Sequence, residues 1–433
     1  MPLSQDEALL LLFHAERRSD RDPRAITDRN RKGGAMKRRG YQWPLRAMLA
    51  AIGLLSLSVF VLAAAAAGGT TRYVSPSGVD NPTCSKNSPC EHVQQAVNIA
   101  SVGDTISLAK GNYVEQVSIA KDLTLTGAGA GASTISAPAV FVPDSQGFLN
   151  IVEINSGASV QMSRLAVAGP GPGTCGSIDR GISVIGESSL AITQAAVSDI
   201  RDNPRSECNN GFDVGAGTQR RGQMTDPEVG HLTIDHTTLT GYQRAAIFVA
   251  GVGSTGQIDH NTIKGAPCTF PCNGPGGIGV FFGASATIDH NTISGNECND
   301  PTLPCGPDWF NDAQSFGILM IGAAPSTVVS HNSLNTNDVG IYTDTGVTID
   351  HNDVASRWFG IATDYGNAAQ VDHNSTTGGI RGIMDFGGTG TFSHNSATGS
   401  SDADLWWDGT STPSFSHNSC GTASPSKAIW DCP

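Results

Sequence analysis

Four aspartates recur at similar places in the C-terminal half of the chain. Asp344 and Asp364 each come four residues after a glycine that begins a Gly-Ile pair, Asp385 comes three residues after such a glycine, and Asp408 occupies the matching place near the C-terminus. If the chain stacks in repeats about 4.8 Å apart, carboxylates one repeat apart have the spacing of a retaining glycosidase pair, and those two repeats apart approach that of an inverting pair. Neighbouring carboxylates are also Ca²⁺ ligands. We therefore predict acid–base catalysis on a glycan by Asp344, Asp364 and Asp385, or a calcium site.

The same aspartates have a second interpretation. The segments 344–346 and 364–366 and the pair Asp408-Gly409 have the composition of ordinary turns, in which an Asp side chain bonds the nearby backbone. The two interpretations differ in where the carboxylates point. An enzyme needs them outward in one cleft, whereas turn residues are satisfied by backbone amides.

Aromatic and arginine side chains surround these aspartates in the sequence. Sugar rings stack on exposed aromatic faces, and arginine orients hydroxyl or carboxyl groups. The predicted substrate-binding residues of this part are Tyr342, Arg357, Trp358, Tyr365 and Arg381. Packing in a core or a cap explains the aromatic residues equally well.

A further set of charged residues lies in the irregular region 175–245, which is rich in arginine. Loops on a rigid scaffold commonly carry binding groups. Asp213 and Arg244 complete the predicted substrate-binding set, because polysaccharide β-elimination needs a proton acceptor and positive charge beside the acid group.

Eight of the eleven histidines occupy one repeat position, as in Ile349-Asp350-His351-Asn352. The eight are His236, His260, His290, His331, His351, His373, His394 and His417. Stacked repeats place them in a ladder at a corner, where Asn tolerates a left-handed turn and bonds along the stack. We interpret the ladder as structural, with metal binding or catalysis as the alternative, and assign no metal ligands.

The steps between these histidines are 24, 30, 41, 20, 22, 21 and 23 residues, so the period is about 22 with two interruptions that carry cysteines. A unit this short, with β-branched runs between Gly, Asn and Asp, cannot bury its own apolar face and must stack on its neighbours. The repeat predicts a parallel β-solenoid of roughly 12 to 13 coils.

The N-terminal part adds a second pattern. Residues 91–101 form an amphipathic stripe, typical of a helix that plugs the first coil. Gly103-Asp104-Thr105-Ile106, Gly111-Asn112-Tyr113-Val114-Glu115 and Leu123-Thr124-Leu125-Thr126-Gly127 follow.

Together with the His-Asn and Gly-Ile repeats, these motifs resemble the right-handed parallel β-helix repeat of the pectin lyase-like superfamily, over roughly residues 72–433. The resemblance implies an all-β, single-stranded β-helix and an activity on polysaccharides. The paired Asp-Asp and the Gly-His-Gly of the polygalacturonase-like set do not occur in the sequence, so no known active site is carried over.

The net charge of the chain limits which classes of molecule it can bind. Residues 68–433 hold 15 Lys+Arg and 33 Asp+Glu, a net charge of −18. This negative charge disfavours binding of nucleic acid. It also disfavours binding of acidic polysaccharides, unless a divalent cation bridges the carboxylates. Ca²⁺ is the only cofactor that we consider, and a polysaccharide or cell-surface glycan is the expected partner of a monomer.

The N-terminal segments predict that the chain is exported. Residues 36–67 combine Lys and Arg with a following apolar run and small residues, the layout of a signal peptide or an N-terminal anchor. Residues 1–35 are a charged extension or a misassigned start, 68–102 an N-terminal cap with a helix, and 103–433 the β-helix. We expect an extracellular or cell-surface protein, in contact with a membrane only if residues 36–67 are kept.

All ten cysteines follow the signal segment, in a compartment where disulfides persist. Spacing favours pairing of neighbours, which leaves one distant pair. The predicted bridges are Cys84–Cys90, Cys175–Cys208, Cys268–Cys272, Cys298–Cys305 and Cys420–Cys432, the last closing a C-terminal cap.

The function predicted from these features is binding or processing of an extended polysaccharide, by lyase or glycoside hydrolase chemistry if the chain is an enzyme. The alternative is a catalytically silent surface or adhesin-like β-helix.

Overall fold

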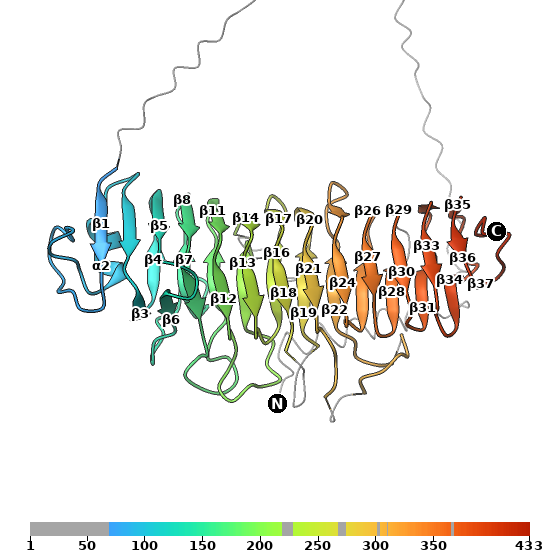
Figure 1. Cartoon of the computed structure of the whole chain (residues 1–433), viewed down its shortest axis with the longest axis horizontal. Helices are drawn as coiled ribbons and strands as arrows, with labels where there is room; N and C mark the ends of the chain where they lie inside the picture. The colour runs from blue at the N-terminus through green and yellow to red at the C-terminus, as the bar shows by residue number, and fades with distance from the viewer. Residues whose placement is uncertain (1–68, 219–227, 267–273, 301–303, 310, 365–367) are drawn as a thin grey trace, which may run out of the picture. The chain divides into compact units, whose positions relative to one another are not determined.

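The computed structural model describes residues 69–433 except 219–227, 267–273, 301–303, 310 and 365–367. In these residues the strands form three parallel sheets of 13, 12 and 12 strands (Figure 1). After β1, which belongs to sheet 1 alone, each turn of the chain contributes one strand to each sheet in the order sheet 1, sheet 2, sheet 3. The predicted all-β parallel β-helix is therefore confirmed.

The strands of each sheet follow in chain order. Sheet 1 comprises β1 (Thr71–Val74), β2 (Thr105–Leu108), β5 (Leu123–Thr126), β8 (Ser159–Ser163), β11 (Ser188–Thr193), β14 (Gly230–Asp235), β17 (Thr255–Asp259), β20 (Ser285–Asp289), β23 (Val328–Ser330), β26 (Thr348–Asp350), β29 (Gln370–Asp372), β32 (Thr391–Ser393) and β35 (Ser414–Ser416). Sheet 2 comprises β3 (Gly111–Val114), β6 (Ser133–Ser136), β9 (Ala166–Ala168), β12 (Ala196–Ser198), β15 (Thr238–Thr240), β18 (Thr262–Lys264), β21 (Thr292–Ser294), β24 (Ser333–Asn335), β27 (Asp353–Ala355), β30 (Ser375–Thr377), β33 (Ser396–Thr398) and β36 (Ser419–Cys420). Sheet 3 comprises β4 (Val117–Ile119), β7 (Asn150–Ile154), β10 (Arg180–Val184), β13 (Phe212–Ala216), β16 (Ala245–Ala250), β19 (Gly276–Phe281), β22 (Phe316–Ile321), β25 (Val339–Thr343), β28 (Phe359–Thr363), β31 (Arg381–Asp385), β34 (Ala403–Trp407) and β37 (Ala423–Ser424).

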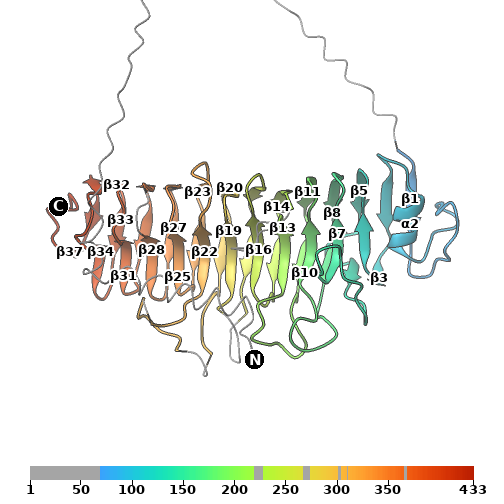
Figure 2. The same ribbon diagram turned by 180° about the vertical axis from the view of Figure 1, so that it is seen from behind.

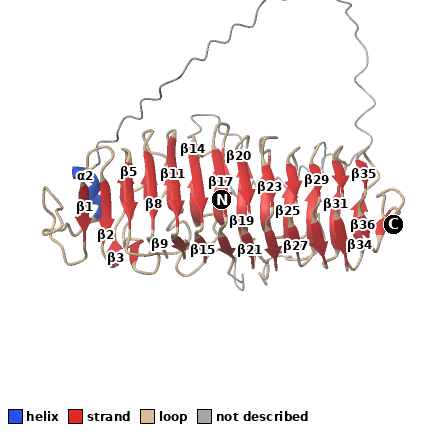
Figure 3. Cartoon of the chain, turned by 45° about the horizontal axis from the view of Figure 1, so that its top comes forward, coloured by secondary structure: helices blue, strands red, loops and turns tan. Residues whose placement is uncertain are grey.

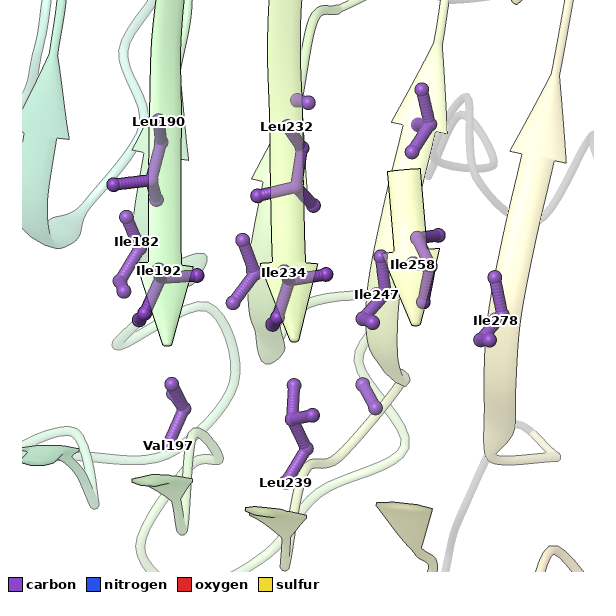
Figure 4. Packing of buried hydrophobic residues seen from close by; sticks show 14 of the residues in the cluster. Ile182, Leu190, Ile192, Val197, Leu232, Ile234, Leu239, Ile247, Ile258 and Ile278 are labelled. Atoms are coloured by element: carbon purple, nitrogen blue, oxygen red, sulfur yellow. The ribbon is translucent and has the colours of Figure 1, made fainter. Parts of the chain in front are cut away.

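The core lies inside the three sheets and consists of columns of aliphatic residues. Ile182 pairs with Val214 and then with Ile247 and Ile278 in successive strands of sheet 3, and all four are buried. Figure 4 shows such columns from sheet 3 facing those of the other sheets, for example Leu232 of sheet 1. Each rung alone exposes this apolar row, so the rungs are stable only in the stack.

The turn between sheets 1 and 2 carries the His-Asn repeat. The histidine, not the asparagine, takes the left-handed conformation, with φ between 45° and 55° in all eight coils. The asparagine that follows is buried and bonds the next rung: the Asn332 amide N and Nδ2 both donate to Asn352 Oδ1, each at 3.0 Å, and Asn352 repeats this to Asn374. The expected ladder is present, but the side chain that tolerates positive φ is the exposed imidazole, because histidine is among the residues enriched there.

The N-terminal cap begins with helix α2 (Val93–Ile99), shorter than the predicted 91–101. It lies beside β1 at one end of the sheets (Figure 3) and buries Val93, Ala96 and Val97. Glu115 accepts the amide protons of Val93 and Gln94, both at 2.8 Å, so the glutamate of the Gly-Asn-Tyr-Val-Glu motif satisfies the helix N-terminus.

The C-terminal cap closes the other end of the sheets. Trp430 is fully buried, and its ring lies 4.1 Å from that of Phe415 between centroids. A disulfide joins Cys420 to Cys432. Trp430 thus covers the apolar end of the last coil.

Four of the five predicted disulfides are present in the described residues, and Cys268–Cys272 lies outside them. Two of the four, Cys175–Cys208 and Cys298–Cys305, lie in the long connections from sheet 2 to sheet 3. These connections project from one edge of the sheets in both views (Figures 1 and 2). Among the described residues, no helix is long and apolar enough to span a membrane.

The asparagine ladder gives a testable prediction. Asn352→Ala removes the donor to Val329 O and the acceptor of two Asn332 bonds, which leaves buried backbone groups unpaired. We expect the free energy of unfolding to fall by about 2–4 kcal/mol, since each orphaned buried group costs about 1–3 kcal/mol. Denaturant unfolding measures this loss. The control is His351→Asn at the adjacent exposed position, where the loss should stay within about 0.5 kcal/mol; equal losses in both variants would show that the ladder does not carry the stability.

Candidate functional site

The outer face of sheet 3 carries an aromatic cluster between β22 and β34. The outer aromatic cluster consists of Trp309, Tyr342, Trp358, Phe359 and Phe386, packed with Val339, Ala362 and Met384. It is separate from the interior core, which holds the Ile341, Ile361 and Ile383 column of the same strands. The cluster therefore lies on the opposite face of sheet 3 from the interior core, and its five aromatic side chains are buried.

Three of the four aspartates lie in one row beside this cluster. The Asp364 amide bonds Thr343 O, and the Asp408 amide bonds Asp385 O, so Asp344, Asp364, Phe386 and Asp408 follow one another from rung to rung. Asp344 and Asp364 are one rung apart, and Asp364 and Asp408 are two rungs apart with Phe386 between them.

The row's carboxylates differ in their partners. Asp344 Oδ1 accepts the Gly322 amide at 2.8 Å, and Asp408 Oδ1 accepts the Thr410 amide at 2.9 Å. Asp364 is only 6% exposed and accepts the Tyr342 hydroxyl at 3.0 Å on Oδ2. The Thr410 amide holds Asp408 as in a turn, and the Gly322 amide of the preceding rung holds Asp344, whereas Asp364 has the Tyr342 hydroxyl as a side-chain partner.

Asp385 does not belong to that row, although the sequence placed it there. It pairs with Thr363 and so stands one position earlier, in line with the buried Thr343 and Thr363. Strand alternation turns it to the side of Ile383, opposite Met384 and Phe386 of the outer aromatic cluster. The expectation that all three aspartates point into one outer cleft is wrong for Asp385, because the spacing after Gly382 is three residues rather than four.

Burial gives Asp385 an unusual charge state. The residue is 0% exposed, and burial raises its pKa to about 6, with a smaller contribution from the charge of Asp408. The Thr363 hydroxyl opposes the shift by donating to Oδ1 at 2.6 Å. Oδ2 has no hydrogen-bond partner among the described residues. Asp385 is thus a buried acid that changes charge near neutral pH.

Arg357 and Trp358 lie where the connection between β21 and β22 is attached to the stacked coils. The Arg357 guanidinium lies 4.7 Å from the Trp358 ring centroid and 3.5 Å from Asp338 Oδ1. Asp338 Oδ2 accepts the Cys298 and Ser315 amides, at 2.6 and 3.0 Å. Burial raises the pKa of Asp338 to about 7, against these hydrogen bonds and the arginine charge. Asp338 and Arg357 together anchor the loop that carries Trp309.

Arg381 is held at the outer aromatic cluster's edge. Its guanidinium lies 4.0 Å from the Trp406 ring centroid, and its Nε donates to Asp402 at 2.8 Å. Trp406 is partly exposed, and its ring lies 4.8 Å from that of Phe386. The Trp406 indole is therefore partly exposed, with a guanidinium fixed over its ring.

The remaining predicted residues lie elsewhere. Asp213 is fully buried on β13, where burial raises its pKa well above the usual range. Arg244 donates to Asn209 Oδ1 and Gly274 O in the connection before β16. Neither belongs to the coils of the outer aromatic cluster. Tyr365 lies outside the described residues.

Trp309 was missed by the sequence reasoning. Its ring lies 5.6 Å from Tyr342, 5.3 Å from Phe359 and 5.5 Å from Phe386 between centroids. The signal was the 41-residue step between His290 and His331, which marks a loop long enough to fold back over sheet 3.

The predicted calcium site was assigned to the aspartate row. Within the described part of the chain, groups of three carboxylate or imidazole ligands occur at the histidine corner and not in this row. What the row holds instead is the hydrogen bond from the Tyr342 hydroxyl to Asp364, next to the outer aromatic cluster.

The buried acid makes a pH-dependent prediction. A folded pKa of about 6 against an ordinary 3.8 means that ionising Asp385 costs stability as pH rises from about 4 to above 6. Asp385→Asn should therefore raise the free energy of unfolding by about 1–3 kcal/mol near pH 7.5, and by close to nothing below the unfolded pKa. Denaturant unfolding of both proteins at the two pH values measures it. Asp338 titrates in the same window but is present in both proteins and cancels; a gain independent of pH would contradict the buried charge.

Comparison with known proteins agrees with this architecture. Residues 223–397 match the family model described as right handed beta helix region. No curated protein matches the chain.

Solved structures with a similar course of the chain include several carbohydrate-related proteins. One is XylC in complex with xylose, at 12% identity and a TM-score of 0.49, with 76% of this chain and 75% of that chain covered. Another is a mannuronic acid specific polysaccharide family 6 lyase from human gut microbiota, at 14% identity and a TM-score of 0.45, with 84% of each chain covered. A third is the pectate lyase Pel9A, at 11% identity and a TM-score of 0.40, with 83% and 79% covered.

At these identities the likeness is one of fold alone. Three parallel sheets wound by one chain give this protein the fold of a parallel β-helix, and residues 223–397 match the right handed beta helix region.

Proposed function

We propose that this chain is an exported protein that binds or processes an extended polysaccharide on the outer face of sheet 3, between β25 and β34. The observation that carries the proposal is the partly exposed Trp406 with Arg381 fixed over it, next to a row of carboxylates. Sugar rings stack on aromatic faces, and a guanidinium orients hydroxyl or carboxyl groups. The four disulfides of the described residues support export.

The spacing of the carboxylates in the row is the basis for the proposed glycosidase chemistry. Asp344 and Asp364 on adjacent rungs are about 4.8 Å apart along the stack, the order of a retaining carboxylate pair. Asp364 and Asp408 are two rungs apart, at about 10 Å, near the upper limit of an inverting pair. Asp364 belongs to both pairs, so it is the acid–base residue of the proposal, with Tyr342 as its proton partner.

A second function has its own supporting observation. Asp344 and Asp408 accept backbone amides, from the preceding rung and from a local turn respectively, and in a catalytically silent surface protein every carboxylate of the row would be held by protein groups in this way. The two functions differ in whether Asp364 and Trp406 act on a ligand.

The test is a screen of the purified protein against neutral and acidic polysaccharides, with and without Ca²⁺. Reducing ends report hydrolysis, and ultraviolet absorbance reports the unsaturated products of a lyase. Asp364→Asn should lower turnover about 100-fold or more, the range of general acid–base catalysis, and leave binding unchanged. Trp406→Ala should weaken binding roughly 3- to 10-fold, equivalent to about 0.5–1.5 kcal/mol of ring stacking.

The control is Asp353→Asn, an exposed carboxylate on sheet 2, which should change neither quantity. Binding and turnover that survive both site variants would exclude this face. Silence across the panel, without binding, would favour the catalytically silent rod.

A further inference from the structure

The eight repeat histidines form a continuous stack on the corner between sheets 1 and 2. Ring centroids of successive histidines are 4.6–5.2 Å apart, and the planes of each pair differ by 17° at most. The members are the histidines at 236, 260, 290, 331, 351, 373, 394 and 417, here called the histidine column. For the seven with an ion-pair contact, the side chains are 44–61% exposed. The column thus presents imidazoles at a fixed repeat to solvent.

Aspartates at the end of the sheet 1 strands set the tautomer of the neutral rings. The Nδ1 atoms of His351 and His373 lie 2.7 and 2.8 Å from the carboxylates of Asp350 and Asp372. A carboxylate only accepts, so each contact assigns the proton to Nδ1 and leaves the lone pair on Nε2. This arrangement is the one that orients metal-binding histidines and raises their basicity.

Where the aspartate is replaced by serine, the previous rung supplies the carboxylate. Asp372 contacts Nδ1 of its own His373 and, at 3.2 Å, Nδ1 of His394, while Ser393 donates to the same carboxylate at 2.6 Å. Asp289 serves His290 and His331 in the same way, at 2.7 and 3.1 Å. Seven rings of the column, all but that of His417, therefore have a carboxylate on Nδ1.

Two neighbouring Nε2 atoms can serve one ion. Zn²⁺ holds imidazole nitrogens at about 2.0–2.1 Å, so two nitrogens on one ion are at most about 4.2 Å apart. The ring centroids are 4.6–5.2 Å apart and the planes nearly parallel, so two half-exposed rings must turn towards one another before their in-plane Nε2 lone pairs meet at one ion. Four groups of one aspartate and two histidines already have ligand atoms within 4.8 Å of one another: Asp259 with His260 and His290, Asp289 with His290 and His331, Asp350 with His351 and His373, and Asp372 with His373 and His394.

We propose that the histidine column is a row of binding sites for divalent transition-metal ions, each ion held by the Nε2 atoms of two neighbouring imidazoles. The net charge of −18 on residues 68–433 draws cations to the surface. Imidazole ligands suit Cu²⁺, Ni²⁺ and Zn²⁺, whereas Ca²⁺ requires oxygen ligands. Eight histidines taken in pairs give about four ions per chain. The site lies on another corner of the rod than the outer face of sheet 3 and does not depend on the proposed glycan function.

The test is equilibrium dialysis of the full-length protein against Zn²⁺, with bound metal counted by elemental analysis. We expect about four Zn²⁺ per chain, tighter binding of Cu²⁺ in the order of the divalent series, and no binding of Ca²⁺ at the column. The Cu²⁺ complex should show two coordinated nitrogens per ion by electron paramagnetic resonance.

Variants separate the column from other histidines. Asn tolerates positive φ, so His351→Asn/His373→Asn removes one pair with the turn preserved and should lower the stoichiometry by one ion. The matched control is His92→Asn, because His92 has the same Nδ1 contact with a carboxylate, Asp80 at 2.8 Å, but lies outside the column. Circular dichroism and thermal unfolding check that each variant is folded. Absence of Zn²⁺ binding, or equal binding by the double variant and wild type, would overturn the proposal.

Discussion

The constraint on which this molecule depends is that every strand is paired with the equivalent strand of the next coil. In a parallel stack each residue meets its counterpart about 4.8 Å away, so whatever occupies a repeat position is multiplied into a column. Aliphatic columns give the interior, and Asn332, Asn352 and Asn374 give a buried polar column in which each side chain satisfies the next. One coil cannot exist without its neighbours, which is why both ends need a cap.

The same constraint explains why charged columns lie where they do. A column of like charges repels itself unless partners intervene, and the two acidic columns of this chain meet the problem differently. Asp350 and Asp372 alternate with imidazoles at the corner of sheets 1 and 2. The row of Asp344, Asp364 and Asp408 is broken by Phe386 and bonded to backbone amides or to Tyr342. A ligand can replace such partners most readily at the surface. The histidine column is exposed there, whereas in the aspartate row Asp344 and Asp408 are partly exposed and Asp364 is buried.

One carboxyl group lies in the interior instead of at the surface. Asp385 stands in a row of buried threonines, with one oxygen bonded to Thr363 and the other without a hydrogen-bond partner among the described residues. A buried carboxyl of this kind costs stability when it ionises. Asp338, which anchors the loop of Trp309, is also buried, and its pKa is raised to about 7 as that of Asp385 is raised to about 6. The net charge of the coils next to the outer aromatic cluster therefore changes near neutral pH. The two buried carboxyl groups and the partly exposed Trp406 thus occur in the same part of the stack.

The sequence alone determined the solenoid, because a repeat of about 22 residues with Gly, Asn and β-branched runs has only stacking available to bury its apolar rows. It also determined four disulfides of the described residues and the corner column of histidines, since both follow from spacing. The tertiary structure decided what spacing cannot express. A difference of one residue after Gly382 moved Asp385 from the outer row to the interior, because strand alternation reverses a side chain with every step. Trp309 reached the outer aromatic cluster through a loop whose path no repeat specifies. The left-handed residue of the corner proved to be histidine, because the asparagine amide is needed inside, where it bonds the rungs above and below.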